Sequence, residues 1–362
     1  MLTSPAQPRL ENPATGEGRA PRSSPAALPE RERRIRALKN APPIFVIGSQ
    51  RSGTSFLYRL IRNYLRIGFG RDNGNFIRFM KNLPHYGDLE QTRNLERLLC
   101  DLFRLPEFKK RFRGLALETG AFIENLEART YAEIVRRFYA EWAYFKDPDA
   151  MRWGGKTPDY SIHAAALHQL LPDAKFIHII RDGRDVALSL FHLAWGPKDA
   201  MLAARHWQER VQAALAFGRS VGPASYFELR YENLVQYPEQ EFERLIRFIA
   251  HEGNLEEVVS RFRREIGDTV KRDNFDKWKK QMPRRQIRVF EQLAGGTLQT
   301  LGYPVVFPEV VGRPFQPWQR LWHHTSNILI KVLIALLVRR GFQRACEKGS
   351  RAWAAVRRRL RH

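Results

Sequence analysis

The sequence has few cysteines, no long apolar run and comparatively few acidic residues. Its two cysteines, Cys100 and Cys346, do not have the spacing of metal ligands, so a reducing compartment is the simpler interpretation. A run of about 18 uninterrupted apolar residues, as a membrane-spanning helix needs, is missing. The N-terminus also lacks the apolar core of a signal peptide. We therefore expect a cytoplasmic protein.

Negative charge is the scarcer sign, with 38 acidic residues against 61 basic ones and a net charge of +23. The excess is uneven: +4 in residues 1–40, +8 in 41–312 and +11 in 313–362. Such a balance favours a polyanionic partner, which is a nucleic acid, an anionic membrane surface or an anionic small molecule. With 362 residues the chain is long enough to bury a full core.

Composition divides the chain into three parts. Residues 1–40 carry six prolines among small and charged residues and predict a disordered basic arm. Residues 41–312 are predicted to form the folded domain. In the C-terminal extension, residues 313–362, the apolar stretch 327–338 lies between tryptophans and arginines. This pattern suits a helix in the interface of a membrane, and a helix buried against the core or a dimer mate is the alternative.

The stretch from Phe45 to Phe56, FVIGSQRSGTSF, organises the rest of the chain. Residues 44–47 are apolar and rich in β-branched side chains, which predicts a buried strand. Gly48 and Gly53 bracket a turn, and an apolar helical pattern follows. Backbone N–H groups in such a turn, ahead of a helix N-terminus, form a site for an anion.

This turn nearly has the spacing of the ATPase P-loop. Thr54 stands where the P-loop has its lysine, so the usual clamp on the β- and γ-phosphates is missing. Arg51 supplies a cation inside the loop instead. A turn with a purely structural role remains the alternative.

Strands alternate with helices along the rest of the folded part. Two further strands are predicted at 174–180 and 225–230, after a short strand before Gly68. Helical patterns cover 90–104, 130–145, 199–218 and 239–250. This alternation predicts an α/β fold, with a central parallel sheet that has helices on both faces and a P-loop-like nucleotide site.

A second strand-to-helix turn carries Arg181, and Asp182 is a plausible cap for the helix that follows. Ligands of open α/β sheets bind beyond the carboxyl ends of the strands. If the turns at Arg51 and Arg181 both lie there, the edge can hold two anionic groups at once. A nucleotide with phosphates at two ribose positions would fit.

Three motifs carry a resemblance to a known family: QRSGTS at 50–55, Arg181 with Ser189, and YENL from Tyr231. Together they resemble the sulfotransferases that use 3′-phosphoadenosine 5′-phosphosulfate (PAPS), over about residues 42–305. The resemblance implies PAPS as co-substrate. It also implies roles for the loop, whose residues would cradle the 5′-phosphosulfate: Arg51, Ser52, Gly53, Thr54 and Ser55.

The resemblance implies further donor contacts. Arg181 and Ser189 match the motif for the 3′-phosphate, and Tyr231 stands where the family often contacts adenine. Lys271 and Arg272 resemble a 3′-phosphate motif of cytosolic members, although both glycines of that motif are replaced here. Other interpretations stay open: Arg181 could pair with a neighbouring carboxylate, Ser189 could be an ordinary helix hydroxyl, and Tyr231 could be a core aromatic.

Lys156, in the sequence GGKTP, resembles the catalytic lysine of the family, with a surface lysine in a turn as the alternative. Sulfuryl transfer needs positive groups around the transferred group and the departing phosphate. The leaving oxygen belongs to an already anionic phosphate. Cations such as Arg51 and Lys156 can therefore stabilise its charge, as a metal ion does in kinases. We infer no metal requirement.

The residue that acts as general base must differ from that of the cytosolic members. They have a histidine where this chain has Pro158. Protein-tyrosine and carbohydrate sulfotransferases use a carboxylate, and the corresponding distance after the loop arginine leads to Asp72. An aspartate in an Asx-turn would look the same. Weaker candidates are Glu118, Glu124 and His163, whereas His178 lies inside a predicted strand and is interpreted as structural.

The predicted acceptor is a hydroxyl of a glycan, lipid or peptide, with a carbohydrate or lipid-linked molecule preferred. Membrane attachment through the extension would place the protein peripherally on the inner face of a membrane. A P-loop kinase or NTPase is one rival, and Thr54 argues against it. A basic nucleic-acid-binding protein is the other, but the sequence has no recognition-helix, zinc or RNP-type motif, so no nucleic acid is expected.

Overall fold

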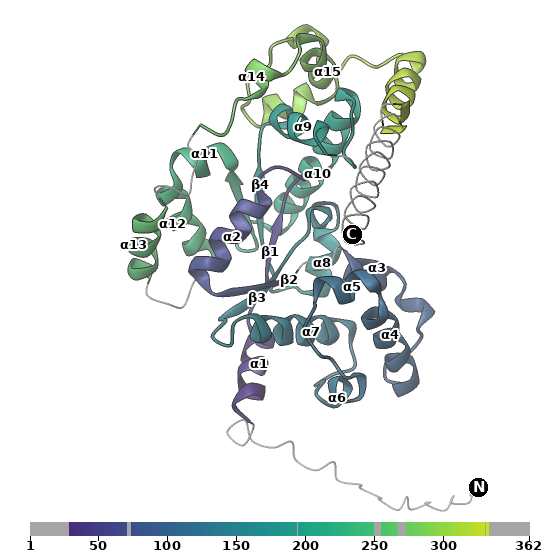
Figure 1. Ribbon diagram of the computed structural model, residues 1–362, viewed down its shortest axis with the longest axis vertical. Coiled ribbons are helices and arrows are strands. Elements are labelled where there is room, and N and C mark those ends of the chain that lie inside the picture. The colour runs from purple at the N-terminus through teal and green to yellow at the C-terminus, as the bar shows by residue number, and fades with distance from the viewer. Residues whose placement is uncertain are drawn as a thin grey trace, which may run out of the picture.

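The computed structural model describes residues 29–70, 74–193, 195–249, 255–266, 273–329 and 331–332. Within them, parallel strands form a five-stranded sheet in the order β2-β3-β1-β4-β5 (Figure 1). The strands are β1 (Ile44–Ile47), β2 (Ile67–Gly70), β3 (Arg152–Lys156), β4 (Lys175–Ile180) and β5 (Tyr226–Arg230). This confirms the predicted α/β fold. Because the strands are parallel, their carboxyl ends share one edge.

The central strand β1 is buried on both faces, as its apolar sequence predicts. Phe45 and Ile47 pack into one apolar cluster, and Ile44 and Val46 pack into another on the opposite face. The alternation follows from the two-residue period of side chains along a strand. With neither face in water, the strand needs no polar residues.

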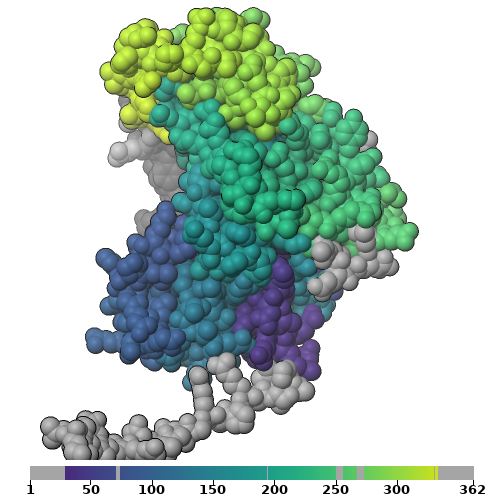
Figure 2. Space-filling view, turned by 180° about the vertical axis from the view of Figure 1, so that it is seen from behind, coloured from purple at the N-terminus to yellow at the C-terminus, as the bar shows by residue number. Residues whose placement is uncertain are grey.

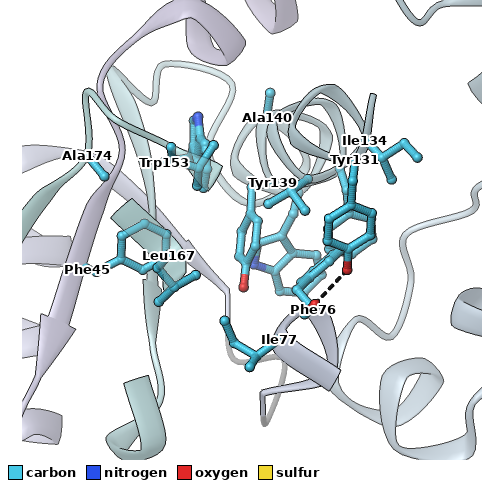
Figure 3. Close-up of a cluster of buried hydrophobic side chains, with 14 of the residues drawn as sticks. Phe45, Phe76, Ile77, Tyr131, Ile134, Tyr139, Ala140, Trp153, Leu167 and Ala174 are labelled. Carbon is cyan, nitrogen blue, oxygen red and sulfur yellow. Dashed lines mark hydrogen bonds between the residues drawn. The ribbon is translucent and has the colours of Figure 1, made fainter. Parts of the chain in front are cut away.

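One face of the sheet is covered by α1 (Glu30–Asn40) and α7 (Tyr131–Lys146), which pack on each other. In Figure 3, Tyr139 of α7 stacks on Trp153 of β3 with 5.0 Å between ring centroids. The Tyr131 hydroxyl donates to the Phe76 carbonyl oxygen at 2.7 Å. Further elements complete this region: α3 (Asn75–Lys81), η2 (Leu83–His85), α4 (Thr92–Arg104), α5 (Pro106–Arg111), α6 (Thr119–Glu124), η3 (Pro158–Ile162) and α8 (Ala164–Leu170).

The other face packs against α2 (Thr54–Leu65), α11 (Tyr231–Gln236), α12 (Pro238–Ile249) and α13 (Leu255–Glu265). A third apolar cluster lies beyond the end of β4 around Trp207 and Phe290. It involves α9 (Gly183–Phe191), α10 (Ala200–Val221), α14 (Trp278–Gln281), α15 (Arg284–Thr300) and residues next to η4 (Pro308–Val310). The predicted helices at 90–104, 130–145, 199–218 and 239–250 correspond to α4, α7, α10 and α12.

Glycines occur inside two of the strands as well as in turns. Gly68 lies in β2, where an added Cβ atom would be 2.3 Å from the Cβ atom of Ala143. Gly154 lies in β3, where it would be 2.3 Å from the Ile44 carbonyl oxygen. Glycine in these strands permits close approach of a neighbouring element, which the sequence pattern does not distinguish from a turn.

The prediction of a disordered arm is wrong for residues 30–40, which form α1. This helix docks on α7 through its basic side chains. Lys39 is buried, with its Nζ atom 2.6 Å from a carboxylate oxygen of Glu127 and 2.8 Å from one of Glu133. Arg31 also pairs with Glu141. Arg31 and Lys39 therefore pair with carboxylates of α7. The other basic side chains of α1 pair outside α7, for example Arg36 with Glu127; residues 1–28 lie outside the described residues.

The predicted C-terminal extension begins with a helix over 317–329 and 331–332, yellow in Figure 1. Two polar side chains of this helix form hydrogen bonds with the segment before α10. The His323 Nδ1 atom lies 2.6 Å from the Asp199 Oδ2 atom, and the Asn327 Oδ1 atom accepts from the Lys198 N–H at 2.7 Å. Residues 333–362 lie outside the described part. Within that part, no helix is long and apolar enough to cross a bilayer.

Candidate functional site

The turn after β1 depends on glycine at both ends. Gly48 has a φ of +147° and Gly53 a φ of +97°. A Cβ atom at Gly53 would lie 2.4 Å from the Cδ2 atom of Tyr231. The Gly48 N–H donates to the Ser161 Oγ atom at 2.7 Å, which fixes the start of the turn. Because α2 begins at Thr54, its first N–H groups border the turn and favour an anion there.

Arg51 connects the two motifs that the sequence analysis singles out. Its Nε atom donates to the Ser189 Oγ atom at 2.8 Å, so the turn after β1 meets α9. Arg51 also has a φ of +71°, a left-handed conformation that is unfavourable for a non-glycine residue. Both strand-to-helix turns therefore meet at the carboxyl edge of the sheet, as predicted.

Hydroxyl groups follow Arg51 in the loop. Ser52 is fully buried, and its Oγ atom has no hydrogen-bond partner within the described residues. Ser55 accepts a hydrogen bond from the Lys156 Nζ atom at 3.1 Å. Lys156 is buried at the end of β3, so the alternative of a surface lysine in a turn is wrong.

Arg181 is buried directly after β4. Its Nη2 atom donates to the Asp185 Oδ2 atom at 3.2 Å and to the Asn274 carbonyl oxygen at 2.9 Å. The Nε atom has no partner among the described residues. The ion pair offered as an alternative role is therefore present, and it leaves one donor of the guanidinium unsatisfied. Burial raises the pKa of Asp185, and the Arg181 charge opposes this shift.

Tyr231 is buried, as a core aromatic would be, and also belongs to the site. The Arg181 guanidinium carbon lies 4.4 Å from the centroid of its ring. Its hydroxyl oxygen accepts from the Asn274 Nδ2 atom at 2.5 Å. The ring thus separates the turn at Gly53 from the turn at Arg181.

The sequence analysis missed a buried charge network behind the second turn. Asp182 caps α9 as predicted, because its side chain accepts from the Arg184 N–H at 2.9 Å. The fully buried Arg184 also pairs with Asp182 at 2.7 Å and with Glu291 at 2.6 Å. Its guanidinium carbon lies 3.5 Å from the Trp278 ring centroid. The only sequence signal is the charge density of RDGRD directly after an apolar strand.

These groups line one cavity of about 450 Å³ at the carboxyl edge of the sheet. Among the described residues, its charged lining side chains are Arg51, Arg59, Lys156 and Arg181, without a carboxylate or an imidazole. The cavity therefore favours an anionic ligand. The remaining lining residues are Gln50, Gly53, Thr54, Ser55, Phe56, Pro158, Ser189, Trp195 and Tyr231.

A second cavity, of about 490 Å³, adjoins the first and shares Ser55 and Arg59 with it. Aromatic residues and further cations complete its lining: Tyr58, Arg62, Phe69, Lys110, Arg111 and Trp142. Within the described residues, Arg59, Lys110 and Arg111 have no ion-pair partner. This cavity therefore combines apolar surface with uncompensated positive charge.

A third cavity, of about 360 Å³, shares Arg51, Arg181 and Ser189 with the first. It extends to Lys277, a cation that the sequence analysis missed. Lys271 and Arg272, the predicted contacts on the same segment, lie outside the described residues.

The predicted base, Asp72, also lies outside the described residues. The weaker candidates Glu118, Glu124 and His163 do not line the first cavity, the one that Arg51 and Arg181 share with Lys156. His178 is fully buried in β4, 2.5 Å from the Tyr226 hydroxyl oxygen, and burial lowers its pKa to about 3. Its structural interpretation is confirmed.

Gln50 is held by a polar network that sequence reasoning missed. Its Oε1 atom lies 2.6 Å from the His206 Nε2 atom, and its Nε2 atom donates to the Asp159 Oδ1 atom at 3.3 Å. Arg210 pairs with the same aspartate at 2.9 Å. Burial lowers the pKa of His206 to about 4, so its imidazole is neutral near pH 7. Within the described residues, no group of three or more His, Cys, Asp or Glu side chains could hold a metal ion.

Comparisons with known proteins point to one family. A sequence model described as the sulfotransferase family matches residues 42–253, more than half of the chain. Protein-tyrosine sulfotransferase A of Caenorhabditis elegans is 24% identical over 298 residues, which cover 76% of this chain and 71% of that protein. An omega-hydroxy-beta-dihydromenaquinone-9 sulfotransferase of Mycobacterium tuberculosis is 30% identical over 127 residues, or 31% of this chain and 32% of that protein.

Among solved structures, the sulfotransferase domain of the Synechococcus olefin synthase resembles this chain with a TM-score of 0.43 and 19% identity. The similarity covers 73% of this chain and 95% of that domain.

Proposed function

This chain belongs to the sulfotransferase family, and from that premise we propose that it transfers the sulfuryl group of PAPS to a hydroxyl acceptor. The observation that carries the proposal is the hydrogen bond from Arg51 to Ser189, which couples two arginine-bearing turns over one cavity. PAPS has a phosphosulfate at the 5′ position and a phosphate at the 3′ position. Its two anionic ends match the two turns.

The unsatisfied groups of the site support this donor. Buried polar groups normally have partners, yet the Ser52 Oγ atom and the Arg181 Nε atom have none in the described part. Phosphate oxygens would satisfy both donors. We assign the 5′-phosphosulfate to residues 51–55 and the 3′-phosphate to Arg181 and Ser189, with Tyr231 beside the adenine. Lys271, Arg272 and the nearby Lys277 complete the proposed 3′-phosphate subsite.

The reaction is an in-line displacement at sulfur. The acceptor oxygen forms a bond to sulfur, and the bond from sulfur to the bridging phosphate oxygen breaks. Adenosine 3′,5′-bisphosphate (PAP) leaves, and the hydroxyl proton passes to a base. Arg51 and Lys156 stabilise the charge that moves toward the leaving phosphate. We assign the base to Asp72, because Pro158 stands where cytosolic members have a histidine and Asp72 follows Arg51 at the distance of the carboxylate in protein-tyrosine and carbohydrate sulfotransferases.

The second cavity supports an acceptor that carries negative charge near its hydroxyl. It adjoins the first cavity, the proposed donor cavity, at Ser55. The Lys156 Nζ atom donates a hydrogen bond to the same serine. The aromatic surface of the second cavity suits a sugar or lipid portion, and its unpaired cations suit a phosphate or carboxylate. The two relatives are named for different acceptors, a protein tyrosine and a menaquinone derivative. We propose a carbohydrate or lipid-linked hydroxyl next to an anionic group.

Calorimetric titration of the purified protein tests the donor. PAP should bind at least about tenfold more tightly than AMP, because AMP lacks the 3′-phosphate that would form charge-assisted hydrogen bonds. ATP should bind no better than AMP. If ATP binds as tightly as PAP, the kinase or NTPase alternative replaces this proposal.

Turnover with labelled PAPS and a panel of membrane lipids, glycans and peptides tests the base. Asp72→Ala should lower kcat at least about a hundredfold and leave PAP affinity near that of the wild type. Asp88→Ala is the matched control, because Asp88 is an exposed aspartate whose side chain accepts from a backbone N–H in a turn. Wild-type turnover of the Asp72 variant would remove this residue from the mechanism.

A further inference from the structure

The helix over 317–329 and 331–332 has its amphipathic pattern reversed. Six of its exposed side chains are apolar, and their helical spacing places them in one stripe. Arg320, His324 and Thr325 are exposed as well. Trp318 is 68% exposed, Leu321 66% and Leu329 67%. The stripe also contains Trp322, Ile328 and Val332. We call these six residues the apolar stripe.

The opposite side of the helix is polar and faces the protein. His323 and Asn327 are its buried members, bound to Asp199 and to the Lys198 N–H. The Lys331 Nζ atom donates to the Trp195 carbonyl oxygen at 3.4 Å. An ordinary surface helix turns its apolar side to the core. This helix is instead held by polar contacts, which leaves the apolar stripe open to a partner outside the fold.

The helix that carries the apolar stripe contacts a residue that lines the first cavity, the proposed donor cavity. Trp195, to which Lys331 is bound, is itself exposed and lines that cavity. Figures 1 and 2 show the yellow helix at the edge of the molecule, seen from opposite sides. The helix is therefore adjacent to an exposed residue of the cavity lining.

We propose that this helix docks the protein on an anionic lipid bilayer, with the apolar stripe inserted among the headgroups. The charge around the stripe identifies the partner. The sequence from 310 to 346 contains no Asp or Glu and has six Lys or Arg residues. Tryptophans beside an apolar face and flanking cations are the features of interfacial helices. A second copy of the chain would bring these like charges together, which disfavours a dimer.

Docking has a consequence for the acceptor, and this step rests on the proposed function. With the stripe in the headgroup layer, Trp195 and the cavity that it lines would lie close to that layer. A hydroxyl on a lipid headgroup or on a lipid-linked sugar could then enter the transfer site without leaving the bilayer. The cationic second cavity would meet the phosphate of such a headgroup.

Vesicle flotation of the full chain, without donor or acceptor, tests the docking. Vesicles of phosphatidylcholine with phosphatidylglycerol should carry the protein, and pure phosphatidylcholine should carry much less. A triple variant, Trp318→Ser, Leu321→Ser and Leu329→Ser, should lower the partition coefficient about a hundredfold. The matched control replaces exposed apolar residues elsewhere, Met151→Ser, Tyr237→Ser and Val306→Ser, and should float like the wild type.

Equal flotation of the triple variant and the wild type would overturn the proposal. So would a concentration-dependent dimer in sedimentation velocity that the triple variant abolishes, because the stripe would then be a subunit interface. PAP titration of the triple variant separates this proposal from the donor assignment. Normal PAP affinity with lost flotation supports docking, whereas absent PAP binding by the wild type contradicts the proposed function and leaves the flotation result standing.

Discussion

The turn after β1 and the turn after β4 border the same cavity but are held in different ways. The first depends on its backbone: Gly48 and Gly53 have positive φ values, and the Ser52 hydroxyl has no partner within the described residues. The second depends on buried charge, because Arg184 pairs with Asp182 and with Glu291. Both turns place an arginine at the cavity.

Because of this difference, we expect substitutions in the first turn to change ligand affinity and substitutions in the second turn to change the free energy of unfolding. In the first turn the Ser52 hydroxyl has no partner within the described residues, and Arg51 makes one side-chain hydrogen bond, to Ser189. Substitutions of these two residues should therefore act on the ligand more than on the fold. In the second turn the charges satisfy one another, and a substitution leaves a buried charge without its partner. The predictions below test this division, from the largest expected effect to the smallest.

Arg184→Leu should give the largest effect, a loss of about 3–5 kcal/mol in the free energy of unfolding, because two buried carboxylates would lose their partner. Urea unfolding followed by circular dichroism measures it. Arg205→Leu is the control, since its 3.7 Å pair with Glu209 is exposed and contributes about 0–1 kcal/mol. Equal losses in the two variants would show that the second turn is not held by its charges.

Arg181→Ala should weaken PAP binding by about ten- to a hundredfold, the contribution of a charge-assisted hydrogen bond. AMP binding should change little, because AMP has no 3′-phosphate. Arg51→Ala should instead weaken both ligands, since the first turn is assigned to the 5′ end. Calorimetric titration of both variants with both ligands measures the four changes. Loss of AMP binding in the Arg181 variant would contradict the assignment of one end to each turn.

The sequence predicted the first turn better than the second. A strand, two glycines and a helix start are local features, so the anion site follows from a continuous stretch of chain. The Arg184 network joins α9 to Glu291 of α15, and no local pattern indicates which distant carboxylate an arginine meets. The correct predictions for the second turn are local contacts, namely the cap at Asp182 and the alternative of an ion pair between Arg181 and a neighbouring carboxylate.

Glycine has two structural roles in this chain that the sequence pattern does not distinguish. Gly53 marks a turn, whereas Gly68 and Gly154 lie in strands that a neighbouring element approaches closely. The disordered arm was assigned from proline and charge, but residues 30–40 fold because α7 supplies partners such as Glu133 and Glu141. The reversed helix after 317 could be predicted as amphipathic, and only its contacts show which side faces outward.

Gly53→Ala should reduce both stability and ligand binding, because its Cβ atom would lie 2.4 Å from a carbon of the Tyr231 ring. Gly222→Ala is the control, since Gly222 also has a positive φ, +74°, but has open space around it. The positive φ should cost each variant about 1–3 kcal/mol. Only Gly53→Ala should also weaken PAP binding, by about tenfold or more. Equal PAP affinity in the two variants would mean that the contact with Tyr231 does not shape the site.

The smallest expected effect is that of Ser52→Ala, which should raise the free energy of unfolding and lower the affinity for PAP. Ser52→Ala removes a buried hydroxyl that has no partner in the described part, so the free energy of unfolding should rise by about 1 kcal/mol. The same variant should bind PAP several-fold more weakly, because that hydroxyl is assigned to the phosphosulfate. Ser161→Ala is the matched control, since its hydroxyl accepts from the Gly48 N–H and its loss should lower stability. If Ser52→Ala also lowers stability, the hydroxyl supports the fold, and the first turn is held by more than its backbone.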